Sequence, residues 1–116
     1  MIPQRRKRQP LGIRQEPQIR CDSHLAWVRG HHCIVAGLNG HVCEGKTESA
    51  HVRRGTDGGL SVKPSDIWSI PLCSGAHMEQ HRIGEQSFEA KYGIDMKKLA
   101  EWFATRSPHR SKWSKE

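Results

Sequence analysis

The 116 residues of this chain are enough for one ordinary domain, and a hydrophobic content of 34% with 6% aromatic residues allows only a small apolar core. The formal net charge is +7 and the pI is near 9.6, which indicates a polyanionic partner. Nucleic acid is favoured and a membrane is not, because no segment is both amphipathic and strongly basic.

Four cysteines and eight histidines could stabilise such a core as metal ligands, or the cysteines could form two disulfides. Disulfides need an oxidising compartment. The basic run at 5–8 resembles the start of a secretory signal, but residues 9–20 contain no apolar segment, and no run is long enough to span a membrane. We therefore expect a cytoplasmic protein in which metal is favoured over disulfides.

The N-terminal region is predicted to be a basic arm followed by a helix. Residues 1–20 carry six Lys or Arg and one Glu, contain three prolines and have no hydrophobic periodicity, so we expect them to be disordered. This arm either binds phosphates or is simply solvated. A short helix through residues 25–28 is predicted next, capped by Asp22 or Ser23 and ending near Gly30.

The middle of the chain is predicted to contain two strands and a helix. Residues 31–52 are short apolar pieces around the turn signal Asn39-Gly40, typical of a hairpin or a zinc-knuckle-like loop whose second arm becomes a strand. The glycine-rich segment 54–59 suits a loop beside a ligand. Residues 67–72 are predicted to be a buried strand that leads directly into a helix over 73–81.

Two further helices are predicted at the C-terminal end. The first runs from Gly84 to Tyr92 and is closed by Gly93. The second is capped by Asp95 and extends to residue 106, with apolar residues at helical spacing. Residues 107–116 are predicted to be a flexible tail, so the domain covers residues 21–106.

Cys33, Cys43 and Cys73 are soft ligands from a loop and a helix start, an arrangement in which a tetrahedral zinc joins separate elements. Cys21 lies outside any close ligand spacing and is expected to be a free thiol. A zinc site needs a fourth ligand, and the sequence leaves four candidates open: His77, His31, His32 and His41.

A second candidate set consists of His51, Asp66, His77 and His81. Histidines at i and i+4 lie on one face of a helix and can chelate a divalent ion, although a chance pair is easy among eight histidines. His51 on the preceding strand could join them or act as a general base. Phosphodiester hydrolysis needs both a metal that stabilises developing charge and a base that deprotonates water.

Four basic residues near these groups are candidates for phosphate contacts, with a solvated charged face as the alternative. They are Arg53, Arg54, Lys63 and Arg82. Nothing in the chain resembles a helix that reads the major groove, so strong sequence specificity is not indicated.

Several of these motifs, in this order, resemble the HNH, or ββα-metal, endonucleases. The resemblance covers about residues 23–106, and it is strongest to small phage and prophage members related to the phage recombination-enhancement nuclease. It is carried by Cys33, Glu48-Ser49-Ala50-His51-Val52-Arg53, Lys63-Pro64-Ser65-Asp66, Pro71-Leu72-Cys73, His77 and His81, together with Ile83-Gly84-Glu85, Phe88 and Tyr92-Gly93-Ile94-Asp95.

The resemblance implies an α+β fold of the His-Me finger type, with flanking helices and a structural zinc held by the three cysteines. It implies that His51 is the general base, that Asp66 either orients it or helps to ligate the metal, and that His77 and His81 hold a catalytic Mg²⁺, Mn²⁺ or Zn²⁺. Two positions depart from the family pattern. Ala50 replaces a frequent metal ligand, and Ala76 replaces a frequent zinc ligand, which makes His77 a candidate for either site.

The expected function is therefore metal-dependent cleavage of DNA, or alternatively RNA, in the cytoplasm of a bacterial or phage-infected cell. A recombination protein is a conceivable partner. The main alternative is a non-catalytic, zinc-stapled nucleic-acid-binding module in which His77 completes the zinc site and the basic arm supplies affinity. A third alternative is an exported, disulfide-bonded domain.

Overall fold

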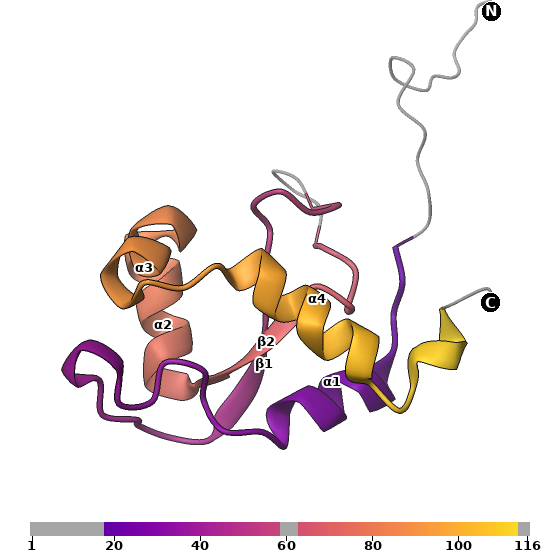
Figure 1. Cartoon of the computed structure of the whole chain (residues 1–116), viewed down its shortest axis with the longest axis horizontal. Helices are drawn as coiled ribbons and strands as arrows, with labels where there is room; N and C mark the ends of the chain where they lie inside the picture. The colour runs from indigo at the N-terminus through magenta and orange to yellow at the C-terminus, as the bar shows by residue number, and fades with distance from the viewer. Residues whose placement is uncertain (1–17, 59–62, 114–116) are drawn as a thin grey trace, which may run out of the picture.

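The computed structural model describes residues 18–58 and 63–113, which form a small α+β domain (Figure 1). Its sheet has two antiparallel strands, β1 (Thr47–His51) and β2 (Ser69–Cys73), with Thr47 opposite Cys73 and His51 opposite Ser69. The expected α+β class is confirmed. The predictions for residues 1–17, 59–62 and 114–116 concern parts of the chain outside the described residues.

Four α-helices complete the domain in the described residues. They are α1 (Asp22–Arg29), α2 (Ser74–Ile83), α3 (Glu85–Tyr92) and α4 (Met96–Arg106), and two short 3₁₀ turns, η3 (Leu38–Gly40) and η4 (Arg110–Lys112), complete the order. Helices α1, α2 and α4 contact the sheet, and α3 packs against α2. In the described ranges, no helix combines the length and apolar character needed to cross a membrane.

Local signals explain where most helices begin and end. Asp95 accepts a hydrogen bond from the Lys98 N–H and caps α4, and Gly93 ends α3 with a φ of 66°, a conformation that favours glycine. Both caps were predicted. The predicted cap of α1 is wrong, because Cys21 occupies the N-cap position without a side-chain hydrogen bond and Asp22 already lies in the first turn.

The core lies around β2, all five residues of which are buried. Helices α1 and α4 contact β2, and α2 continues directly from its last residue (Figure 1). β2 begins two residues later than predicted and ends one residue later. The late start arises because the Trp68 N–H donates to the Ser65 carbonyl and keeps residues 66–68 in a turn. The buried core includes Val28, Val35, Ala50, Val52, Ile70, Leu72, Phe88, Met96, Ala100 and Phe103.

Both ends of the described chain make contacts that the sequence did not suggest. Residues 18–21 lie along residues 63–66, where the Asp66 N–H donates to the Ile19 carbonyl at 2.8 Å. After α4, the chain turns back to α1, and the Lys112 ammonium group donates to the Ser23 hydroxyl at 3.0 Å.

Trp102, which the helical periodicity places off the apolar face of α4, has 47% of its surface exposed.

Candidate metal centre and histidine cleft

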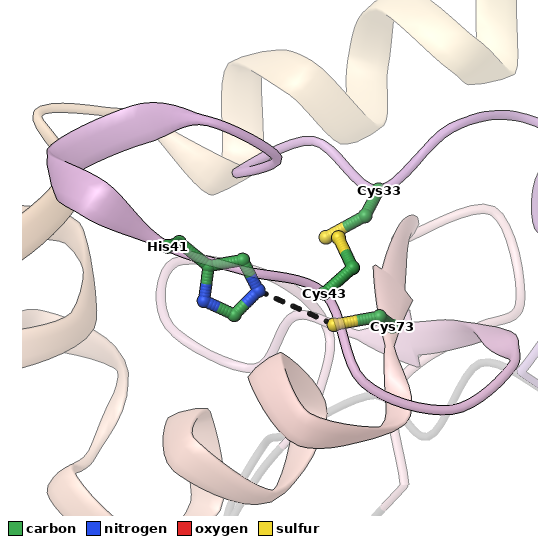
Figure 2. Close-up of side chains that lie close together, drawn as sticks. All are labelled: Cys33, His41, Cys43 and Cys73. Atoms are coloured by element: carbon green, nitrogen blue, oxygen red, sulfur yellow. Dashed lines mark hydrogen bonds between the residues drawn. The ribbon is translucent and has the colours of Figure 1, made fainter.

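One group of thiols and imidazole has the composition of a metal site. Cys33, His41, Cys43 and Cys73 place one ligand atom each within 4.8 Å of all the others (Figure 2). We call this group the Cys₃His cluster. Three sulfurs and one imidazole nitrogen are a common ligand set for tetrahedral zinc, so the cluster could bind a metal such as zinc. All four cysteines of the chain, including Cys21, are free thiols.

The loop between α1 and β1 brings these ligands together. It reverses direction at η3, where Gly37, Asn39 and Gly40 have φ values of 76°, 47° and 74°. The turn signal at Asn39-Gly40 thus marks a reversal, and the described residues 31–46 form no strand, so the loop is not a hairpin. Cys73 approaches from the other side, at the junction of β2 and α2.

His41 is the fourth member of the cluster, since its Nε2 lies 3.3 Å from the Cys73 sulfur. The other candidates lie elsewhere. His31 Nδ1 bonds the Trp27 carbonyl at 2.8 Å, and His77 faces Glu48. The spacing of His41, two residues before Cys43, is the signal that could have singled it out, because neighbouring ligands on one loop reach a common centre easily.

The groups around Cys73 favour the thiolate form of its side chain. Burial acts to raise the pKa of this thiol, but hydrogen bonds from the Ala76 and Glu44 N–H groups and contacts with His41 and Cys43 outweigh it and lower the pKa to about 7. Desolvation and the neighbouring thiols raise the pKa of Cys43 to about 12. Since thiolates are the metal-binding form, the lowered pKa of Cys73 favours its binding of a metal over that of Cys43.

A separate cleft of about 390 Å³ gathers three histidines beside α2. We call it the histidine cleft. His51 comes from the end of β1, and His77 and His81 come from successive turns of α2. The remaining lining residues are Arg53, Lys63, Gln80, Gly84 and Glu85. The cleft therefore contains all three histidines of the second predicted set, while Asp66 lies behind it.

Asp66 holds the imidazole of His51. The His51 Nε2 is 2.9 Å from the Asp66 Oδ1, and the other carboxylate oxygen accepts the Cys21 N–H at 2.7 Å. Burial tends to raise the pKa of Asp66, but the bonds from His51 and Cys21 and the charge of Arg20 lower it overall. Burial lowers the pKa of His51 against the opposing effect of Asp66, so the imidazole is neutral at neutral pH.

His77 and His81 bring one ring nitrogen each together, within hydrogen-bond distance. Their Nε2 atoms are 3.3 Å apart, while His77 Nδ1 bonds the Glu48 Oε1 at 2.7 Å. A histidine that donates one N–H to a carboxylate exposes a lone pair on its other nitrogen, as ligating histidines in metal sites usually do. No role was predicted for Glu48 from the sequence; its place on β1, three residues before His51, was the available clue.

The four candidate phosphate-binding residues divide into two groups. Arg53 and Lys63 line the histidine cleft. Arg54 instead pairs with Glu89 at 3.2 Å, and Arg82 lies 3.9 Å from Glu79 with 72% of its side chain exposed. Hence only the first pair is placed to meet a ligand in the cleft. Ala50, the departure noted above, is a core residue.

A protein-family model matches residues 11–107 of the chain, and its description is "Protein of unknown function (DUF968)". No curated protein and no solved structure matches the chain.

Proposed function

The chain belongs to the DUF968 family, and we propose that it is a metal-dependent endonuclease of the HNH type that hydrolyses phosphodiester bonds in DNA. One observation carries the proposal: a single cleft brings the Asp66-bound His51 together with the paired imidazoles of His77 and His81. A general base beside two converging metal-ligand nitrogens is the combination that phosphodiester hydrolysis requires.

The order of elements supports the ββα-metal fold. Two antiparallel strands, β1 and β2, are followed directly by α2, and the general base and the metal-binding histidines come from the first strand and the helix. The Cys₃His cluster joins the loop before β1 to the start of α2. A structural zinc at this position would hold in place the helix that carries His77 and His81.

His51 suits the role of general base. Its Nε2–H donates to Asp66, which leaves the lone pair on Nδ1 for the proton of an attacking water. Because burial lowers the pKa of His51, the base is in its active, neutral form at neutral pH. Asp66 fixes the tautomer of the imidazole and stabilises the imidazolium that forms after proton transfer.

His77 and His81 would hold the divalent ion, for which Mg²⁺, Mn²⁺ and Zn²⁺ are the candidates. The pair fits an ion because the two Nε2 atoms lie next to each other and Glu48 orients the ring of His77. Such an ion would stabilise the charge that develops on the phosphate and the leaving oxygen. Arg53 and Lys63 would bind the neighbouring phosphates of the strand.

The test is incubation of purified protein with supercoiled DNA, single-stranded DNA and RNA, in Mg²⁺ or Mn²⁺. We expect cleavage that chelator abolishes, and we expect His51→Ala to reduce its rate by about 10²- to 10⁴-fold. His32→Ala is the matched control, because His32 is exposed and lies outside the cleft. Absence of cleavage, or equal rates for His51→Ala and the parent, would refute the enzyme proposal.

The competing function is a zinc-stapled module that binds nucleic acid without cutting it. That interpretation needs His77 as the fourth zinc ligand. The histidine of the Cys₃His cluster is instead His41, and His77 lies in the histidine cleft. Elemental analysis separates the possibilities: two metal sites per chain support the nuclease, one supports the module, and none supports the disulfide-bonded domain. A recombination-protein partner and a location in a bacterial or phage-infected cell stay predictions.

A further inference from the structure

Residues 18–21 are tied to the segment that carries Asp66. The Arg20 guanidinium donates from Nη1 to the Pro64 carbonyl at 2.6 Å and from Nη2 to the Lys63 carbonyl at 3.1 Å. The Ile19 N–H donates to the Ser65 hydroxyl at 2.9 Å. These contacts are 43 to 46 residues apart in the sequence, so they hold two distant segments in one arrangement.

The same arginine lies beside the buried carboxylate. Arg20 Nη1 is 3.5 Å from the Asp66 Oδ1, the oxygen that also meets the His51 Nε2, and the Asp66 side chain is only 2% exposed. The next residue, Cys21, donates its N–H to the second oxygen of Asp66. Adjacent residues of one short segment therefore contact both oxygens of the carboxylate that orients the general base.

We propose that Arg20 is a positioning residue of the histidine cleft, which holds residues 63–66 so that Asp66 orients His51 and Lys63 faces the cleft. The inference rests on the base role proposed for His51. Arg20 does not line the cleft; it contacts Asp66 and the carbonyls of residues 63 and 64, and its charge lies near His51. The prediction of disorder for residues 1–20 is wrong at Arg20, which contacts Asp66 and the carbonyls of Lys63 and Pro64.

The guanidinium group matters as well as its charge. Arg20 donates to two carbonyls through two nitrogens while it faces a carboxylate, a forked geometry that a lysine ammonium cannot reproduce. Arg20→Lys therefore keeps the positive charge but loses one of the backbone contacts. Arg20→Ala loses both. The pair separates the effect of charge from the effect of geometry.

The test reads the tautomer of His51 by ¹⁵N NMR and, in the same variants, the pH dependence of DNA cleavage. In Arg20→Ala we expect a smaller population of the Nε2–H tautomer and a cleavage rate about tenfold lower. The pH midpoint should rise, because a positive charge near His51 is removed. The other ionisable groups around His51 are Asp66, Lys63, Arg53, His77, His81 and Glu85.

Arg20→Lys should keep the pH midpoint of the parent and lose part of the rate. Arg29→Ala, which removes an exposed arginine at the end of α1, should match the parent in every measurement. A parental tautomer and pH profile in Arg20→Ala would overturn the inference, whatever the thermal stability. If Arg20→Ala does not fold, a parental rate and tautomer in Arg20→Lys would overturn it.

The outcome is distinguishable from failure of the proposed function. If the parent protein does not cleave nucleic acid, the nuclease proposal fails, but the tautomer of His51 still reports whether Arg20 positions Asp66. If the parent cleaves through His51 and Arg20→Ala behaves like the parent, only the inference about Arg20 fails.

Discussion

Mild acid should destabilise this fold through His24, a residue of α1 that takes no part in the proposed chemistry. Its surface is fully buried, its Nδ1 lies 2.9 Å from the Ser107 hydroxyl, and its Nε2 has no hydrogen-bond partner among the described residues. The ring is covered by Trp27 and Trp113, with ring centres 5.8 and 5.0 Å away. Burial lowers its pKa from 6.5 to about 4.

The size of the effect follows from proton linkage. The unfolded chain binds a proton at His24 as the pH falls through 6.5, whereas the folded protein binds it only near 4. The contribution of the neutral His24 to the free energy of unfolding is therefore fully present above pH 6.5 and is lost as the pH falls towards 4. Each pH unit inside this window removes about 1.4 kcal/mol, so the loss is about 2 kcal/mol by about pH 5 and about 3 kcal/mol in total.

The assay is urea unfolding of the parent and of His24→Asn at about pH 7.5 and about pH 5. Asparagine is neutral at both values and keeps a polar atom near the Ser107 hydroxyl, while loss of metal at low pH affects both proteins equally. We expect the free energy of unfolding of the parent to fall by about 2 kcal/mol more than that of the variant. Equal losses in the two proteins would refute the reasoning.

Three further predictions concern the site. Asp66→Asn should lower the pKa of His51, because the carboxylate that favours its charged form is gone; an NMR titration would contradict this if the pKa stayed the same or rose. Glu48→Gln should weaken Mn²⁺ binding about tenfold by removing the charged partner of His77, and titration by electron paramagnetic resonance measures it. Cys43→Ser should remove one zinc per chain in elemental analysis, and unchanged zinc would exclude it as a ligand.

The elements set by short-range signals were predictable. The helix over 96–106 was predicted to within a residue, because its cap at Asp95, its apolar periodicity and the glycine before it all lie in one short stretch. The strand that ends at His51 was predicted from the arm that follows the Asn39-Gly40 turn signal and from the family resemblance. The N-cap of α1 was not predicted correctly. The Cys21 N–H at this position donates to the carboxylate of Asp66, which lies far along the chain.

The spacing of residues along the sequence could not identify the fourth member of the Cys₃His cluster. Sequence alone left His31, His32, His41 and His77 equivalent as the fourth member of the cluster. The fold of the loop at η3 over the start of α2 brings His41 to Cys73 and leaves His77 beside Glu48. The resemblance marked Ala76 as the place of a missing zinc ligand, but His41, the fourth member of the Cys₃His cluster, comes from the loop before β1.

By itself, the sequence determined the α+β class, the positions of the helices and of the strand before His51, and the two sets of residues with metal-binding chemistry. These properties depend on residue type and on neighbours within a few positions. Only the tertiary structure decided that His41 meets Cys73, that Glu48 holds His77, and that Arg20 belongs with residues 63–66. Those pairings join residues 29 to 46 positions apart, and only packing brings such residues together.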